Sequence, residues 1–299
     1  MRIAAGRTVS HVKPAAFEYF QPTTVGETVS LLASLEDAKV LAGGQSLVPA
    51  MNFRLSRPAA IVDINRVQGL NGIELGAGWL TVGALARHRA FETPPVEGPL
   101  GHLLATAANF VGHLPIRVRG TFVGSLAHAD PAAEWCLVAR TLDAELKAAS
   151  VSGERTIAAA DFFQTLFTTD LRSDELLVSV RLPALDSTFR VGFAEFSRRA
   201  GDFALVMAAA VIKVEGDVIT QARIGIGGAA DKPIRMAQAE NALVGKDANP
   251  EVCEEVASLA AAEVEPLADI HGSSEYRRDL VRAMTKRALR QALAPEGAR

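Results

Sequence analysis

Apolar and polar positions change their period several times in the first third of the chain, which predicts short helices and strands in mixed order. Residues 23–35 carry apolar side chains at helical spacing behind a threonine that can cap the first turn. Short apolar runs at residues 39–42 and 59–64 predict strands, and residues 72–86 alternate around glycines as a hairpin does. Strand, helix and strand together predict a small α/β layer.

The middle of the chain predicts more helices and a second group of strands. The expected elements are helices at 88–93 and 98–112, a hairpin at 145–159 and a strand at 175–183. Asp130 and Pro131 predict the start of one further helix, with aspartate as the N-cap and proline at the first helical position. We expect this helix to end near Leu142.

After Pro183 three apolar strand patterns follow one another, and three helical patterns come after them. The strands are expected at 188–199, 205–216 and 218–228, and the helices at 233–245, 250–264 and 274–293. Strands followed by helices predict a compact α+β domain, with a boundary near residues 182–187. The fold class is therefore α+β, with two domains.

Composition narrows the possible functions. The 299 residues are 49% apolar, enough for sizeable cores, and 31 Lys and Arg nearly balance 34 Asp and Glu, so no basic face for nucleic acid is expected. No apolar run approaches the ~18 residues that a membrane span needs. The first residues lack the apolar core of a secretory signal, so a cytoplasmic location is expected. Two cysteines are too few to hold an iron–sulfur cluster or a structural zinc ion on this chain, so no metal site is expected.

Two glycine-containing segments could hold an anion. The first follows a predicted strand and is called here the first glycine loop: Ala42, Gly43, Gly44, Gln45, Ser46 and Leu47. Adjacent glycines allow a close backbone approach, and successive N–H groups can form a nest for a diphosphate. For a single Gly-Gly pair, an ordinary tight turn is the competing interpretation.

The second segment, called here the second glycine loop, covers residues 120–125 and includes Thr121, Val123, Gly124 and Ser125. His128, Asp130 and Glu134 follow it. Each of these three side chains also has a structural interpretation, as a packed histidine, a helix cap or a residue that favours the helix dipole. Two such loops on one α/β scaffold favour a dinucleotide site. The sequence contains no G-x-G-x-x-G after a strand and no P-loop, and no acid–base constellation is evident.

Several ordered segments resemble the FAD-binding medium subunit of molybdenum hydroxylases, a family that includes carbon monoxide dehydrogenase and the flavin portion of xanthine dehydrogenase. They read KPAAFEYFQPTTVGETVSLLA, VLAGGQSLVPAMNFRLSRPAAIVDINRV, RVRGTFVGSLAHADPAAEW, FAEFSRRAGDFALV and DKPIRM. The resemblance implies a two-part FAD-binding domain of the vanillyl-alcohol-oxidase (PCMH) type and a small C-terminal α+β domain with a three-stranded antiparallel sheet and helices. It divides the chain into an extra arm (1–13), an FAD-binding domain (14–184, with subdomains 14–65 and 66–184) and a C-terminal domain (185–293).

The resemblance also implies roles for single residues. Both glycine loops would hold the FAD diphosphate. Glu134 would bind sugar or ribityl hydroxyls of FAD, and His128 and Asp130 would lie in the same ligand-facing segment. Phe203 would lie near the isoalloxazine ring, with Leu176 or Leu177 as an apolar contact. Three positions depart from the family pattern: Val123 replaces a glycine, Ser125 replaces an asparagine, and no lysine stands near Ala194.

The function implied by this resemblance is electron transfer. FAD on this chain would take electrons from [2Fe-2S] clusters on a small subunit and pass them to an external acceptor, while a large molybdopterin subunit oxidises the substrate. The expected assembly is a dimer of heterotrimers. Two alternatives remain open: a free-standing FAD-dependent oxidase of the same fold, and a binding module that has lost its flavin.

Overall fold

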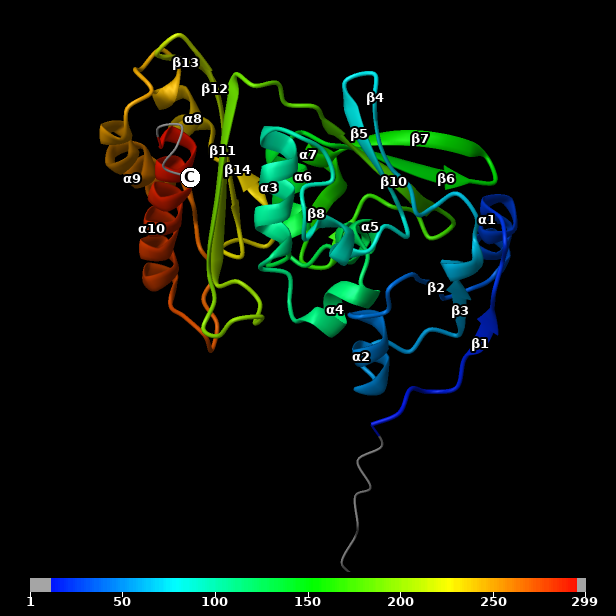
Figure 1. The fold of residues 1–299 in the computed structure, drawn as a ribbon. Helices are drawn as coiled ribbons and strands as arrows, with labels where there is room; N and C mark the ends of the chain where they lie inside the picture. Colours follow the sequence, from blue (N-terminus) through cyan, green and yellow to red (C-terminus); the bar gives the residue numbers. More distant parts are fainter. Residues whose placement is uncertain (1–11, 295–299) are drawn as a thin grey trace, which may run out of the picture.

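The computed structural model describes residues 12–294, which form two units packed against each other (Figure 1). The first unit contains two larger sheets, a two-stranded β8-β9 sheet and most of the short helices, and the second unit contains one sheet backed by three helices. Within residues 12–294, no helix is long and apolar enough to cross a membrane. Residues 1–11 of the expected N-terminal arm lie outside the described range.

A three-stranded parallel sheet with the order β1-β3-β2 begins the fold. Its segment contains β1 (Glu18–Phe20), α1 (Val25–Ser34), β2 (Ala38–Leu41), α2 (Leu47–Asn52), β3 (Ala60–Asp63) and the 3-10 turn η1 (Ile64–Arg66). The expected helix and both strands are confirmed, and the side chain of Thr24 caps α1 by accepting from the N–H of Glu27. The sequence did not predict β1, because three mostly exposed residues are too short to show a period.

The second sheet has five antiparallel strands in the order β4-β5-β10-β6-β7. These strands are β4 (Ile73–Gly76), β5 (Trp79–Gly83), β6 (Glu145–Ser150), β7 (Gly153–Ala158) and β10 (Leu176–Pro183), and both expected hairpins are confirmed. The other elements of the first unit are short: η2 (His88–Phe91), α3 (Pro99–Ala108), α4 (Leu114–Arg119), α5 (Phe122–His128), α6 (Glu134–Thr141), α7 (Ala159–Phe162), β8 (Phe163–Thr165) and β9 (Thr168–Thr169).

The predicted start of α6 was wrong. The helix begins at Glu134 with Ala133 as its N-cap, and Asp130 lies in a turn before it. The side chain of Asp130 accepts from the N–H of Ala132 at 2.9 Å, two residues further on. The carbonyl of Pro131 accepts from the N–H of Gly228 in the second unit at 2.8 Å. A long-range contact therefore holds this segment outside the helix.

The C-terminal unit has a four-stranded antiparallel sheet, not the three-stranded one expected. Its elements are β11 (Phe189–Phe196), β12 (Val206–Glu215), β13 (Val218–Gly227), β14 (Ile234–Arg235), α8 (Ala237–Leu243), η3 (Pro250–Val252), α9 (Cys253–Glu263) and α10 (Ser274–Leu293). The fourth strand, β14, has two residues that pair with Gly225 and Ile226 of β13. A strand this short exists only through that pairing, which local periodicity does not reveal.

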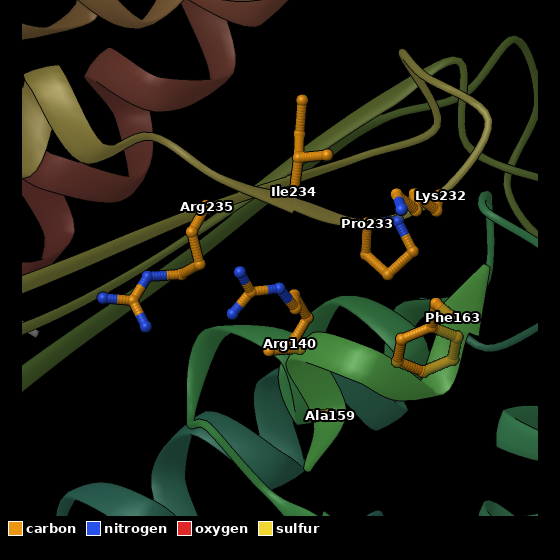
Figure 2. A pocket seen from close by; sticks show the side chains of 8 residues that line it. Arg140, Ala159, Phe163, Lys232, Pro233, Ile234 and Arg235 are labelled. Atoms are coloured by element: carbon orange, nitrogen blue, oxygen red, sulfur yellow. The ribbon is translucent and has the colours of Figure 1, made fainter. Parts of the chain in front are cut away.

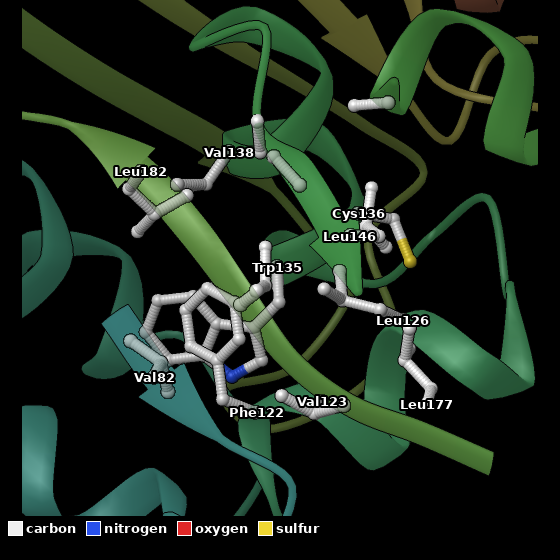
Figure 3. Close-up of a cluster of buried hydrophobic side chains, with 14 of the residues drawn as sticks. Val82, Phe122, Val123, Leu126, Trp135, Cys136, Val138, Leu146, Leu177 and Leu182 are labelled. Carbon is white, nitrogen blue, oxygen red and sulfur yellow. The ribbon is translucent and has the colours of Figure 1, made fainter. Parts of the chain in front are cut away.

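Two apolar cores meet at the C-terminal sheet. Along β12, Met207 and Ala209 face the first unit, and Ala208 and Ala210 face the helices of the second. In the first core, Trp135 of α6 is fully buried among aromatic and aliphatic side chains (Figure 3). The sheet of the second unit thus contributes one face to each core and fixes the two units against each other.

Candidate FAD site

The two glycine loops meet in space. A Cβ built on Gly43 would lie 2.5 Å from the carbonyl oxygen of Arg119 and 2.5 Å from the Cα of Gly120. A Cβ built on Gly124 would lie 3.8 Å from the Cβ of Ala42. Segments about 80 residues apart are therefore in backbone contact. This contact requires a glycine at position 43, because there is no space for a Cβ atom between the two backbones.

Two polar side chains that the sequence analysis did not single out tie the loops together. Asn65 donates from Nδ2 to the carbonyl of Ala42 at 2.8 Å. Arg87 donates from Nη2 to Oδ1 of Asn65 at 2.6 Å and from Nη1 to the carbonyl of Arg119. The sequence could have indicated Asn65, because it directly follows a predicted strand. The parallel strands β2 and β3 end at the same edge of the sheet, so residues that follow them lie close together. No local sequence pattern indicated a role for Arg87.

The first glycine loop offers several backbone donors. Within the described part of the chain, the N–H groups of residues 43–46 have no hydrogen-bond partner, and Gly44 has φ +70°. Buried or partly buried N–H groups are rarely left without a partner in a folded protein. A set of neutral donors beside a second loop therefore fits a diphosphate, which accepts several N–H bonds.

The second glycine loop is more helical than expected. α5 begins at Phe122, and the side chain of Thr121 caps it by accepting from the N–H of Gly124 at 3.1 Å. The side chain of Val123 is 2% exposed and lies in the first core near Leu177 (Figure 3). The backbone N–H of Val123 has no partner among residues 12–294. The valine thus places its side chain in the core and leaves its backbone donor free.

The acidic segment after α5 is partly buried. His128 packs its ring against Phe167 with 5.1 Å between ring centroids, and burial lowers its pKa. Burial raises the pKa of Asp130. Glu134 is 9% exposed, and no other residue in the described range donates to its carboxyl. Burial, followed by the charge of Asp130, raises the pKa of Glu134 to about 7.

Glu195 joins this group, and the sequence analysis missed it. It lies on β11, two residues after Phe193, so both side chains face the first unit. Its Oε2 atom is buried and has no hydrogen-bond partner in the structure. Burial, and then the charge of Glu134, raises the pKa of Glu195 to about 9. The burial of this carboxyl depends on the packing of β11 against the first unit, which the sequence pattern does not show.

The two buried carboxyls make stability depend on pH. Because their pKa values are higher in the folded chain than in the unfolded chain, the folded state binds more protons from about pH 4.5 upward, and the free energy of unfolding falls as pH rises toward 9. Glu195→Gln is expected to leave stability nearly unchanged at pH 5 and to increase it by about 1–3 kcal/mol at pH 8.5. Urea denaturation of the purified chain at both pH values measures this, with the exposed Glu74→Gln as control. An equal effect of Glu195→Gln at both pH values would contradict the prediction.

The residues expected beside the flavin ring differ in exposure. Phe203 is 66% exposed on the loop between β11 and β12, where Gly201 packs against the ring of His113 just before α4. Leu176 is 2% exposed and Leu177 4% exposed, so the protein itself already covers nearly all of both side chains. Phe203 therefore has free surface for a planar ligand, and the two leucines have little. All three assignments remain predictions.

Comparisons with known proteins agree with this architecture. Residues 15–185 match the family described as FAD binding domain in molybdopterin dehydrogenase, and residues 192–292 match the CO dehydrogenase flavoprotein C-terminal domain. The chain is 36% identical to the nicotine 6-hydroxylase medium subunit of Paenarthrobacter nicotinovorans, over 94% of this chain and 99% of that protein. It is 33% identical to the carbon monoxide dehydrogenase medium chain of Hydrogenophaga pseudoflava, over 94% and 98%.

Solved structures give the same result. Quinoline 2-oxidoreductase from Pseudomonas putida 86 has a chain that superposes with a TM-score of 0.88 at 38% identity, over 94% of this chain and 98% of that chain. A chain of the Hydrogenophaga pseudoflava carbon monoxide dehydrogenase gives 0.90 at 35% identity, with the same coverage. Both matched domains and near-complete coverage identify this protein as a member of the family of FAD-binding medium subunits of multi-subunit molybdenum hydroxylases.

Proposed function

We propose that this chain holds FAD between its two glycine loops and passes electrons from iron–sulfur clusters on a small partner subunit to an external acceptor. A large molybdopterin subunit oxidises the substrate, and the complete enzyme is a cytoplasmic dimer of heterotrimers. The observation that carries the proposal is the backbone contact between the loops, together with the unpartnered N–H groups of residues 43–46.

The residues of this chain bind and orient the cofactor. The N–H groups of residues 43–46 and of Val123 donate to the diphosphate, and Ser46 and Ser125 add hydroxyl donors. Glu134 accepts from sugar or ribityl hydroxyls, which supplies the partners that its buried carboxyl lacks. Bound FAD supplies the ability to exchange electrons with partners that deliver or accept them singly or in pairs.

Exposed apolar side chains support the presence of partner subunits. α4 has no buried residue, and Leu114 on it is 54% exposed. Phe53 and Leu55, which follow α2, are 69% and 84% exposed. Groups of large exposed apolar side chains are typical of surfaces that another protein covers. The segments that flank the two glycine loops therefore present surface suited to a partner.

Purification of the chain alone and together with the neighbouring reading frames tests this function. A flavin absorption band near 450 nm, the absence of substrate turnover by the isolated chain, and a native mass several times 31.6 kDa after co-expression are expected. Turnover by the isolated chain would instead establish the free-standing oxidase. A colourless chain that does not take up added FAD would establish the module that has lost its flavin.

A further inference from the structure

A group of cationic side chains lies where α6 and α7 of the first unit meet β14 of the second. A cavity of about 200 Å³ opens between α6, α7 and β14, and it is called here the cationic cavity. Its lining consists of Arg140, Ala159, Ala160, Phe163, Lys232, Pro233, Ile234 and Arg235. Three of these side chains are cationic and none is acidic. In Figure 2 the guanidinium of Arg140 lies beneath β14, with Arg235 on one side and Lys232 on the other.

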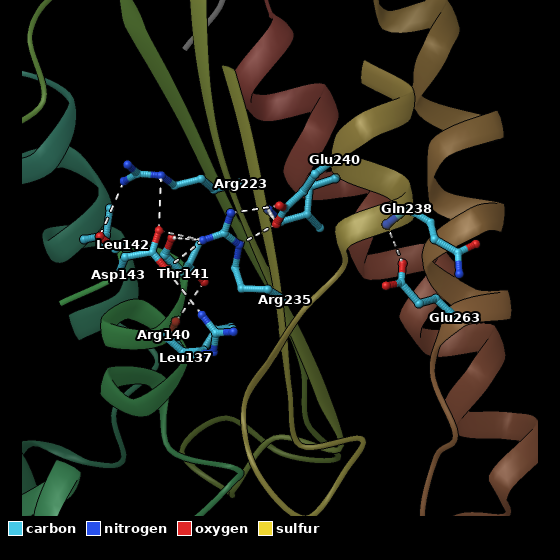
Figure 4. Close-up of polar contacts among 11 residues, drawn as sticks. Leu137, Arg140, Thr141, Leu142, Asp143, Arg223, Arg235, Gln238, Glu240 and Glu263 are labelled. Carbon is cyan, nitrogen blue, oxygen red and sulfur yellow. Dashed lines mark hydrogen bonds and ion pairs between the residues drawn. The ribbon is translucent and has the colours of Figure 1, made fainter. Parts of the chain in front are cut away.

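Arg235 is already neutralised. It forms a fork with Glu240, with Nη2 to Oε2 at 2.8 Å, and its Nη1 lies 2.9 Å from Oδ2 of Asp143 (Figure 4). Asp143 is shared, because Arg223 also lies 3.7 Å from it. Asp143 and Glu240 are therefore engaged by arginines that hold β13 and β14 to the end of α6. Asp161 of α7 adds a further negative charge near Arg140, with no ion pair between the two side chains among residues 12–294.

Arg140 and Lys232 are left with unused positive charge. The guanidinium of Arg140 makes a single hydrogen bond in the described part of the chain, to Oδ1 of Asp143 at 3.3 Å, although it carries five N–H donors. Lys232 has no ion pair or hydrogen bond from its ammonium group among residues 12–294. Burial, and then the charge of Arg235, lowers the pKa of Arg140. A partly buried cation without a full set of partners favours an anion beside it.

The carbonyl groups at the end of α6 do not compete for these cations. Arg235 donates to the carbonyl of Thr141 and Arg223 donates to that of Leu142, both at 3.4 Å. The negative end of the α6 dipole is thereby compensated by arginines other than Arg140. The donors of Arg140 and Lys232 therefore remain available on the cavity side.

We propose that the cationic cavity binds a tetrahedral oxyanion, as free phosphate or as the phosphate group of a larger molecule. At about 200 Å³ the cavity has room for a five-atom oxyanion and is too small for a whole dinucleotide. Arg140 supplies N–H donors from the first unit, and Lys232 supplies its ammonium group from the second. The bound anion thus links α6, which begins at Glu134, to the segment that leads into β14.

Titration calorimetry with inorganic phosphate tests the site in the full chain saturated with FAD, at constant ionic strength. Saturable 1:1 binding is expected, with a rise of about 2–4 °C in melting temperature that sodium chloride does not reproduce. Arg140→Gln combined with Lys232→Met is expected to weaken binding at least tenfold without loss of flavin absorbance. The matched control is Lys246→Met, at an exposed lysine of the second unit.

A phosphate monoester, glycerol 3-phosphate, distinguishes the two sources of the anion. Tighter binding of the ester than of inorganic phosphate indicates a phosphate group on a larger molecule, and weaker binding indicates the free anion. The proposal is overturned if neither compound gives saturable heat, or if the double variant binds phosphate as tightly as the unmodified chain. Because flavin absorbance is followed separately, these outcomes do not depend on the FAD site.

Discussion

Gly43→Ala is expected to weaken FAD binding by about 100-fold or more. The added Cβ would lie 2.5 Å from backbone atoms of both Arg119 and Gly120, and neither atom belongs to a flexible side chain. One glycine loop must then move away from the other, so the N–H groups of residues 43–46 no longer face the second loop. A 100-fold loss corresponds to about 2.7 kcal/mol of binding free energy. Fluorescence titration of the apoprotein with FAD measures it.

Gly26→Ala is the matched control for this substitution. Gly26 lies in α1 of the same layer, and no atom lies within 4 Å of a Cβ built there. This variant is expected to bind FAD with unchanged affinity. Circular dichroism of both apoproteins checks that Gly43→Ala remains folded. Unchanged FAD affinity and stoichiometry in a folded Gly43→Ala protein would show that the loop contact does not form the diphosphate site.

Trp135→Ala is expected to lower the free energy of unfolding by about 3–5 kcal/mol. Its indole is fully buried, with 4.4 Å between its centroid and that of Phe122 and 5.3 Å to that of Phe91. It also donates from Nε1 to Nδ1 of His88 at 2.8 Å. Because Phe122 belongs to the second glycine loop, FAD affinity is expected to fall as well. Urea denaturation measures the stability change.

Trp135→Phe separates the hydrogen bond from the packing. Burial, followed by the charges of Arg87 and Arg117, lowers the pKa of His88 to about 4, so the imidazole is neutral at pH 7 and can accept the indole N–H. The phenylalanine variant keeps an aromatic ring but leaves Nδ1 of His88 without its donor, and a loss of about 1–3 kcal/mol is expected. If Trp135→Ala cost no more than Trp135→Phe, the aromatic packing would not be what stabilises this region.

Much of the fold was predictable from local patterns. The helix at residues 25–34, both hairpins and the long strands of the C-terminal sheet were confirmed, because each has a clear period and a recognisable cap or turn. The first glycine loop was also recognisable, since paired glycines after a buried strand are a local signal. The change of pattern after Pro183 likewise indicated two domains, and the ordered motifs indicated the family that the comparisons confirm.

Contacts between distant segments decided the rest. Asp130 precedes the helix instead of capping it, because the carbonyl of Pro131 pairs with Gly228 almost 100 residues away. The two-residue strand β14 exists only through its partner β13. The buried carboxyl of Glu195 meets that of Glu134 only where the two units pack together.

The chain by itself determined the periods, the Thr24 cap of α1 and the two glycine loops of this medium subunit, because these depend on residues close together in sequence. Only the tertiary structure decided that Gly43 meets Gly120, that Asn65 and Arg87 tie these loops, and that Arg140 faces Lys232 across a cavity. The physical reason is that these contacts depend on how sheets and helices pack, and packing joins residues whose separation along the chain carries no local signal.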